Sequence, residues 1–101
     1  MDLNIAVNVP ANYKRLGQTV ERALRRIIDG KGAQRHSGHL PWVKQPMFDI
    51  GAKVGSGFAI GQVLKKIDEA LRMEDAAAVN ELLDCIGYLA GAIETIEEGN
   101  R

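Results

Sequence analysis

The residues best suited to metal or acid–base chemistry are two carboxylates, Glu81 and Asp84, in an E-x-x-D arrangement. On a helix, a spacing of three places both side chains on one face. Such a pair can bind Mg²⁺, which prefers oxygen ligands and commonly bridges to phosphates. Spacing alone equally describes a solvated acidic face, so that alternative stays open. Tyr88 lies one turn further on, beside a glycine rather than a charge, which favours a ligand-binding face.

A second group of polar residues is typical of phosphate binding. Lys31, Arg35 and His36 lie among glycines in one short segment. Arginine offers a bidentate fork and lysine a point charge, while glycine backbone lets amides turn towards an anion. Trp42 or Tyr88 is the candidate to stack on a base. An ordinary polar loop is the competing interpretation of this segment.

The charges are unevenly distributed along the chain, although the net charge is zero. Residues 14–36 hold seven basic residues and two acids, whereas residues 67–101 hold nine acids and two basic residues. The two regions could simply attract each other within a fold or a dimer. Alternatively, the basic groups hold phosphates and the acids hold a metal. Because duplex binders usually show a basic footprint, the zero net charge makes nucleic acid an unlikely partner.

Apolar residues recur at helical spacing in three segments, which predicts an all-α protein. Residues 11–29 form one helix, capped by Gly30. Residues 58–73 and 75–98 form two more, with Asp75 as the N-cap of the second, and the short turn between them predicts an antiparallel hairpin. The apolar residues expected in the core are Leu24, Ile27, Val63, Leu64, Ile67, Leu82, Ile86 and Ile93.

The remaining segments lack a sustained period. Residues 1–10 form an N-terminal arm, and residues 30–57 form a long loop containing glycines, both histidines and the tryptophan. Within that loop, 47–54 could form a short helix. Long loops in compact domains are often functional, and packing of Trp42 and Phe48 into the core is the alternative.

Gly87 and Gly91 lie in the interior of the last predicted helix, where glycine costs roughly 1 kcal/mol relative to alanine. That loss makes sense if a ligand or another helix approaches the backbone, and helix packing is favoured. Because a domain of this length leaves much of its surface exposed, we expect a small helical bundle completed by oligomerisation, as a homodimer or higher homo-oligomer.

Composition sets the expected environment. The chain of 101 residues is long enough for one domain, and its 46% hydrophobic and 26% charged residues are ordinary for a soluble protein. The single cysteine, Cys85, cannot form an internal disulfide, which favours a reducing, cytoplasmic location. We expect no membrane partner, because no apolar run approaches spanning length and the first ten residues do not resemble a signal peptide.

Three stretches together resemble the small phage-type members of the all-α NTP pyrophosphatase (MazG-like) superfamily. They are Arg35-His36-Ser37-Gly38, residues 65–69 (KKIDE) and residues 81–89 (ELLDCIGYL). The resemblance implies a helical oligomer in which an E-x-x-E and an E-x-x-D helix hold Mg²⁺. It also implies cleavage of a nucleoside triphosphate to a monophosphate and pyrophosphate.

The first of the two family motifs is incomplete here. Asp68 and Glu69 are adjacent rather than three apart, so they point about 100° from one another on a helix. Glu69 lies on the side of this helix opposite its apolar residues, so Glu69 is the one expected to join Glu81 and Asp84 as a Mg²⁺ ligand. Gln62 and Lys65 share that side and are candidate substrate contacts.

Three functions therefore remain open. The first is a Mg²⁺-dependent nucleoside triphosphate pyrophosphohydrolase, with Glu81 and Asp84 as catalytic metal ligands. The second is a protein that binds a nucleotide or another phosphorylated small molecule without cleaving it. The third is an adaptor module whose helical hairpin dimerises. A thermal-shift screen of nucleotides with and without Mg²⁺ separates them.

Overall fold

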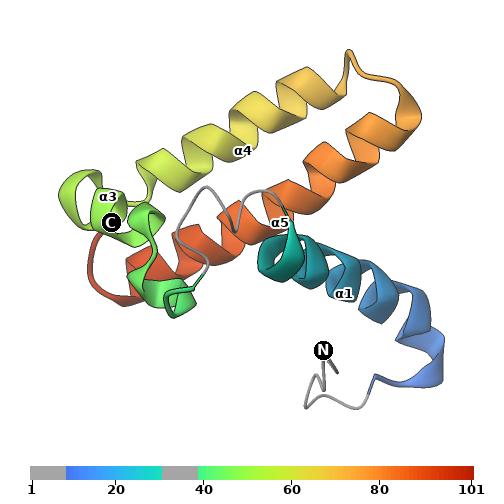
Figure 1. The fold of residues 1–101 in the computed structure, drawn as a ribbon, viewed down its shortest axis with the longest axis horizontal. Helices are drawn as coiled ribbons and strands as arrows, with labels where there is room; N and C mark the ends of the chain where they lie inside the picture. The colour runs from blue at the N-terminus through green and yellow to red at the C-terminus, as the bar shows by residue number, and fades with distance from the viewer. Residues whose placement is uncertain (1–8, 31–38) are drawn as a thin grey trace.

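The computed structural model describes residues 9–30 and 39–101, and most of these residues are helical (Figure 1). The expectation of an all-α fold is confirmed. The helices, in chain order, are a short 3-10 helix η1 (Ala11–Tyr13), α1 (Lys14–Asp29), a 3-10 helix η2 (Trp42–Lys44), α3 (Pro46–Val54), α4 (Gly57–Ala70) and α5 (Asp75–Glu97). The expected arm at residues 1–8, and residues 31–38 of the expected loop, lie outside the described residues.

The helix expected over residues 11–29 is present, with its first turn wound as η1 and the rest as α1. Pro10 precedes η1 and its carbonyl accepts a hydrogen bond from the Tyr13 amide at 2.9 Å. Gly30 is the C-cap, as expected, and its amide donates to the Arg26 carbonyl at 3.0 Å. Its φ of −82° is not left-handed, so the cap does not depend on glycine's conformational freedom.

The second half of the segment expected as a loop is partly helical. The short helix considered for residues 47–54 is α3, and Pro46 occupies its first turn, where the missing amide hydrogen costs nothing. Gly55 ends α3 with a φ of +79°, a left-handed conformation that favours glycine. The Ser56 amide and hydroxyl both donate to the Arg101 carbonyl, at 3.1 and 2.9 Å, which holds the end of the chain beside the start of α4.

Helices α4 and α5 form the predicted antiparallel hairpin, and their contact is the most extensive in the molecule (Figure 1). The structure shifts the hairpin boundaries slightly. Helix α4 ends at Ala70 rather than residue 73, and Glu74, not Asp75, is the N-cap of α5. Glu74 has the extended backbone of a cap, and its carbonyl accepts a hydrogen bond from the Ala78 amide.

The two interior glycines of α5 mark where other helices approach it. A Cβ atom at Gly87 would lie 2.9 Å from Ile27 Cδ1 of α1, and one at Gly91 would lie 2.6 Å from Met47 Cε of α3. The favoured interpretation of these glycines, helix packing, is therefore confirmed. Figure 1 shows the consequence: α1 meets the middle of α5 through its C-terminal half, while its N-terminal half extends away from the hairpin.

The expected core is wrong in its composition. Val63 is buried, and Leu24, Ile27 and Ile86 are half-buried, but four of the eight expected core residues are exposed: Leu64, Ile67, Leu82 and Ile93. The buried hydrophobic residues are mostly small: Ala23, Ala59, Val63, Ala70, Leu83, Cys85 and Ala92. Because α1 and α3 pack on the small-residue side of α5, the large apolar stripe is left on the outside.

Among the described residues, α5 is long and apolar enough to cross a membrane by length and composition alone. The chain itself buries 28% of the apolar window of this helix. Helices α1, α3 and α4 all contact α5, and the larger part of this window is exposed.

Candidate functional site

Four charged side chains and one tyrosine from α1, α4 and α5 lie close together: Arg26, Lys66, Glu81, Asp84 and Tyr88. We call them the central cluster. Arg26 of α1 donates two hydrogen bonds to Asp84 of α5, from Nε to Oδ1 at 2.8 Å and from Nη2 to Oδ2 at 3.1 Å. This bidentate geometry matches a guanidinium to a carboxylate, and it fixes the side of α1 that faces α5. The hydrogen bond to Asp84 raises the pKa of Arg26, so the guanidinium stays charged.

Lys66 of α4 lies between the two carboxylates. Its Nζ is 3.5 Å from Glu81 Oε1 and 3.9 Å from Asp84 Oδ2. The same amine lies 5.9 Å from the centre of the Tyr88 ring, within the range of a cation–π contact. The side chains of Lys66 and Glu81 are each only 19% exposed. Glu81 and Asp84 therefore do share a face, and two cations neutralise them there.

One oxygen of the central cluster lacks a hydrogen-bond partner in the part of the chain that the structure describes. Glu81 Oε2 is buried and has no hydrogen-bond donor among the described residues. Burying a charged oxygen without a donor is costly, so such an atom in a folded protein calls for an explanation, such as a ligand, an ion or a water molecule.

The remaining sequence-predicted site residues lie elsewhere. Lys65 and Glu69 form an ion pair at 3.8 Å along α4, and Lys65 is 67% exposed. Gln62 is half-buried on α4, and Trp42 packs edge-on against Phe48 with ring centroids 4.9 Å apart. Lys31, Arg35 and His36 lie outside the described residues. The structure thus brings together Glu81, Asp84 and Tyr88 from the predicted set.

A Mg²⁺ site with three carboxylate ligands is not assembled in this arrangement. Within residues 9–30 and 39–101, no three His, Cys, Asp or Glu side chains are grouped to hold a metal. Glu69 pairs with Lys65 instead of joining Glu81. Mg²⁺ needs only one or two protein carboxylates when phosphate oxygens and water supply its other ligands. The unpartnered oxygen of Glu81, with Asp84 beside it, fits that smaller requirement.

Arg26 and Lys66 are the members of the cluster that the sequence alone did not indicate. Lys65, rather than Lys66, is the substrate contact expected from the sequence, because Lys65 lies opposite the large apolar residues of α4. The small residues face α5 instead, and Lys66 is spaced four and three residues from Ala70 and Val63, which are buried. Positions three and four apart share one side of a helix, so Lys66 lies on the same side of α4 as these buried residues, beside the contact with α5.

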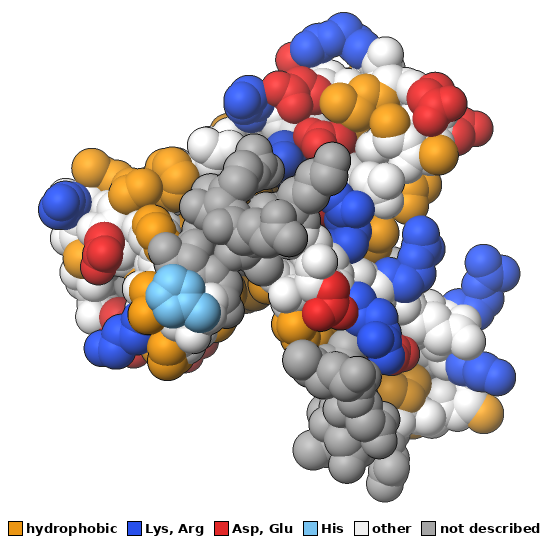
Figure 2. Space-filling model, in the orientation of Figure 1, with side chains coloured by type: hydrophobic (Ala, Val, Ile, Leu, Met, Phe, Trp, Pro, Cys, Tyr) orange, Lys and Arg blue, Asp and Glu red, His pale blue; other side chains and the backbone are white. Residues whose placement is uncertain are grey.

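Arg26 belongs to a row of basic residues on α1. Taking 100° per residue, Arg15, Arg22 and Arg26 lie on one side of this helix. Figure 2 shows Lys and Arg side chains gathered along α1, whereas Asp and Glu side chains are prominent over the end of the hairpin. The row ends at the central cluster, so an anion that approaches along α1 meets positive charge up to Arg26.

Cys85 directly follows Asp84 on α5 but faces the contact between α4 and α5. It is buried, and its thiol donates a weak hydrogen bond to the Val63 carbonyl at 3.8 Å. Burial raises the pKa of the Cys85 thiol, so this residue is a packing element.

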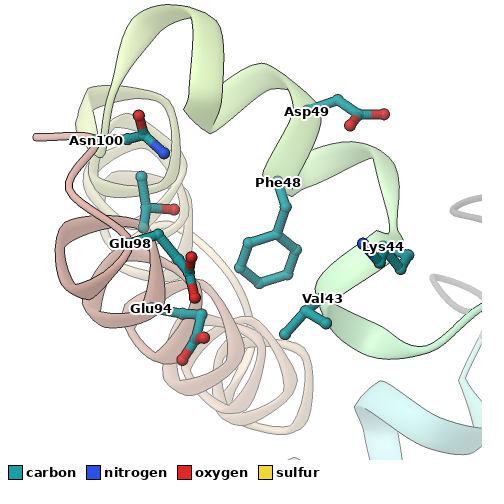
Figure 3. Close-up of a pocket in the computed structure, with 8 residues that line it drawn as sticks. Val43, Lys44, Phe48, Asp49, Glu94, Glu98 and Asn100 are labelled. Atoms are coloured by element: carbon teal, nitrogen blue, oxygen red, sulfur yellow. The ribbon is translucent and has the colours of Figure 1, made fainter.

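A pocket of about 270 Å³ lies apart from the central cluster, between α3, the preceding η2 and the end of α5 (Figure 3). Phe48 and Val43 form its apolar side, and Glu94 of α5 and Glu98, the C-cap of α5, point their carboxylates towards it. Asp49 adds a third carboxylate and Lys44 one amine. None of the sequence-predicted site residues lines this pocket, and its excess of negative charge does not suit a phosphate.

Comparison of the chain with protein-family models, with curated proteins and with solved structures finds no match.

Proposed function

We propose that the protein binds a nucleotide, or another phosphorylated small molecule, together with Mg²⁺ at the central cluster. The observation that carries this proposal is the buried Glu81 Oε2, which has no donor within residues 9–30 and 39–101 and lies in a cluster with two cations and an aromatic ring. In a protein without a ligand here, a buried carboxylate oxygen would be expected to find a donor.

The mixture of charges in the cluster supports a mixed-charge ligand. A bare phosphate would gain from Arg26 and Lys66 but would be repelled by Glu81 and Asp84. A complex of Mg²⁺ and phosphate presents both signs, so each internal ion pair can be exchanged for one with the ligand. Arg26 supplies a planar fork for phosphate oxygens and Lys66 a point charge. Glu81 and Asp84 would hold the metal, and Tyr88 offers a ring for stacking.

Binding and cleavage are separate steps of the proposal. When bound at this position, Mg²⁺ would neutralise phosphate charge and lower the pKa of a coordinated water. The resemblance to the all-α NTP pyrophosphatases makes release of pyrophosphate the reaction to assay. Binding without release would identify the chain as a non-catalytic nucleotide-binding protein.

The test is a thermal-shift screen of ribonucleoside and deoxyribonucleoside triphosphates with Mg²⁺, with EDTA, and with Mg²⁺ alone. A ligand at 100 times its Kd stabilises the native state by about 2.7 kcal/mol, which raises the Tm of a domain of this size by about 10 °C or more. We expect such a shift with at least one nucleotide, and a smaller one in EDTA.

Two neighbouring lysines provide a matched pair of variants. Lys66→Met removes the amine that lies between the carboxylates, and Lys65→Met removes an exposed amine from the next position of α4. The nucleotide-induced shift should be lost in Lys66→Met and retained in Lys65→Met, each compared with its own Tm without ligand. Asp84→Asn should remove the Mg²⁺ dependence. If the wild-type protein shows no shift with any nucleotide at millimolar concentration, the proposal fails and a dimerising helical module remains.

A further inference from the structure

The first half of α1 projects from the hairpin and leaves an apolar surface exposed. Figure 1 shows this half extending away, and α5 is the only α-helix that α1 contacts among the described residues. Tyr13 of η1 is 55% exposed, and Leu16 and Val20 of α1 are 60% and 43% exposed. Val9 is exposed as well and packs beside Gly17. We call Val9, Tyr13, Leu16 and Val20 the α1 apolar surface.

The opposite side of the same half-helix is basic. At 100° per residue, Lys14 is about 160° from Leu16, and Arg22 is about 160° from Val20. Lys14, Arg15 and Arg22 are exposed, and none of the three forms an ion pair in the part of the chain that the structure describes. Lys and Arg side chains accordingly stand out along this helix in Figure 2. The first half of α1 is thus amphipathic, with both of its sides accessible.

A partner for this half-helix has to satisfy both sides. A nucleic acid would meet the cations but would leave the α1 apolar surface in water. An apolar groove on another protein would cover the apolar side but would give the cations no counter-charge. A membrane interface with anionic headgroups supplies both environments, because helices with Lys and Arg on the polar side bury their apolar side at the boundary between headgroups and acyl chains.

The dimensions of a helix suit this arrangement. A helix with its side chains is about 10–12 Å across, and the Debye length at physiological ionic strength is about 8 Å. Because long Lys and Arg side chains also extend towards headgroups, the cations stay within reach of the lipid charge when the apolar side is buried. A helix that lies in the interface needs neither a membrane-spanning run nor a signal peptide, the two features whose absence predicted no membrane partner.

We infer that η1 and the first half of α1 bind the surface of a membrane that contains anionic lipid. The α1 apolar surface enters the interface, and Lys14, Arg15 and Arg22 are attracted by the headgroup charge. Arg26 of the central cluster lies ten residues after Leu16, about 15 Å further along the helix. The membrane surface and the proposed ligand site are therefore separate, and the failure of one proposal leaves the other standing.

Flotation of the protein with lipid vesicles tests this inference. Wild type should bind vesicles that contain equal parts of phosphatidylcholine and phosphatidylglycerol, and it should not bind vesicles of phosphatidylcholine alone. Binding should weaken in 1 M salt, because the Debye length falls to about 3 Å. A wild-type protein that binds neither kind of vesicle, or that binds both equally well, overturns the inference.

Matched apolar substitutions locate the contact. Leu16→Gln acts on the α1 apolar surface, and Leu64→Gln acts on α4 at a position that is 65% exposed. Both variants should fold, because both positions are exposed and glutamine has nearly the helix propensity of leucine. Partitioning onto the anionic vesicles should fall by about tenfold or more in Leu16→Gln, since a buried leucine side chain supplies at least that factor. It should be retained in Leu64→Gln, and the reverse result overturns the inference.

The contribution of charge has its own matched pair. Arg15→Gln/Arg22→Gln removes two exposed cations from α1, and Lys44→Gln/Lys53→Gln removes two exposed cations from η2 and α3. Each cation close to an anionic membrane strengthens binding by about fivefold. The α1 double variant should therefore bind about tenfold or more weakly, whereas the control should bind nearly as well as wild type. Equal losses would show that net charge alone drives binding and would overturn the inference.

Two other occupants of this surface give different results. If a second copy of the chain covers it, wild type sediments as a dimer that Leu16→Gln dissociates, and no vesicles are bound. If a nucleic acid binds it, duplex DNA or RNA retards wild type in a native gel, Arg15→Gln/Arg22→Gln abolishes the shift, and Leu16→Gln leaves it unchanged without vesicle binding. Either pattern overturns the membrane assignment.

Discussion

Arg26 and Asp84 are 58 positions apart in the sequence, yet they form a bidentate ion pair with donor–acceptor distances of 2.8 and 3.1 Å. This pair joins α1 to the hairpin at the point where Ile27 meets Gly87. The packing and the charge contact therefore reinforce one another, and both depend on the same side of α1 facing α5.

The coupling between Arg26 and Asp84 is measurable in a double-mutant cycle of Arg26→Gln and Asp84→Asn, followed by urea unfolding. We expect an interaction energy of about 1–2 kcal/mol, since charge-assisted hydrogen bonds stabilise but both side chains are partly exposed. The exposed pair Arg25 and Glu21 serves as the control, with an expected coupling of about 0.3–0.5 kcal/mol. Equal coupling in the two cycles would mean that the Arg26 contact does not anchor α1.

Glycine-to-alanine substitutions on the two hairpin helices should have opposite effects. A Cβ at Gly61 of α4 meets nothing within 4 Å, so Gly61→Ala should stabilise the protein by about 0.5–1 kcal/mol through helix propensity. A Cβ at Gly87 would lie 2.9 and 3.1 Å from two carbons of Ile27. Gly87→Ala should therefore be destabilising, because the Ile27 side chain must leave its packed position against α5.

Chemical denaturation of both glycine variants beside the wild-type protein makes this comparison. Stabilisation of similar size by Gly61→Ala and Gly87→Ala would show that α1 does not approach α5 as closely as described.

The buried thiol of Cys85 should react slowly with thiol reagents. Burial raises its pKa from an ordinary value of 9.0, so the reactive thiolate is scarce in the folded protein. Labelling with 5,5′-dithiobis(2-nitrobenzoate) at pH 8 should be at least about 100-fold slower in buffer than in urea, because the native state must open first. Rapid labelling in buffer would contradict the packing of α4 on α5.

The same shift in the pKa of Cys85 gives a pH dependence of stability. The unfolded thiol ionises at lower pH than the folded one, so the folded state loses stability as the pH rises above about 9. Below that pH the contribution is fully present. The free energy of unfolding should fall less steeply between pH 8 and 10 in Cys85→Ala than in wild type, and identical slopes would remove the thiol as a cause.

The long helices and the hairpin follow from local patterns in the sequence. Apolar residues at helical spacing, the break at residues 71–74 and Gly30 after Asp29 are local signals, and helices form from local hydrogen bonds. The two glycines of α5 also indicated a close approach, since their cost in a helix needs a compensating contact. The E-x-x-D spacing placed Glu81 and Asp84 on one face for the same local reason.

Which side of each helix is buried depends on contacts between helices, which local sequence patterns do not specify. From the sequence, the large apolar residues of α4 and α5 are expected in the core, because burial of large apolar side chains is the stronger driving force for folding. Within one chain, however, α1 and α3 pack on the small-residue side, where backbones can approach closely. This packing places Lys66, rather than Lys65, beside the carboxylates of α5. Lys65 and Glu69 point away from those carboxylates, because adjacent positions on a helix point about 100° apart. Helical period reveals the apolar and polar sides of a helix, but the choice of neighbour depends on contacts between residues far apart in the chain.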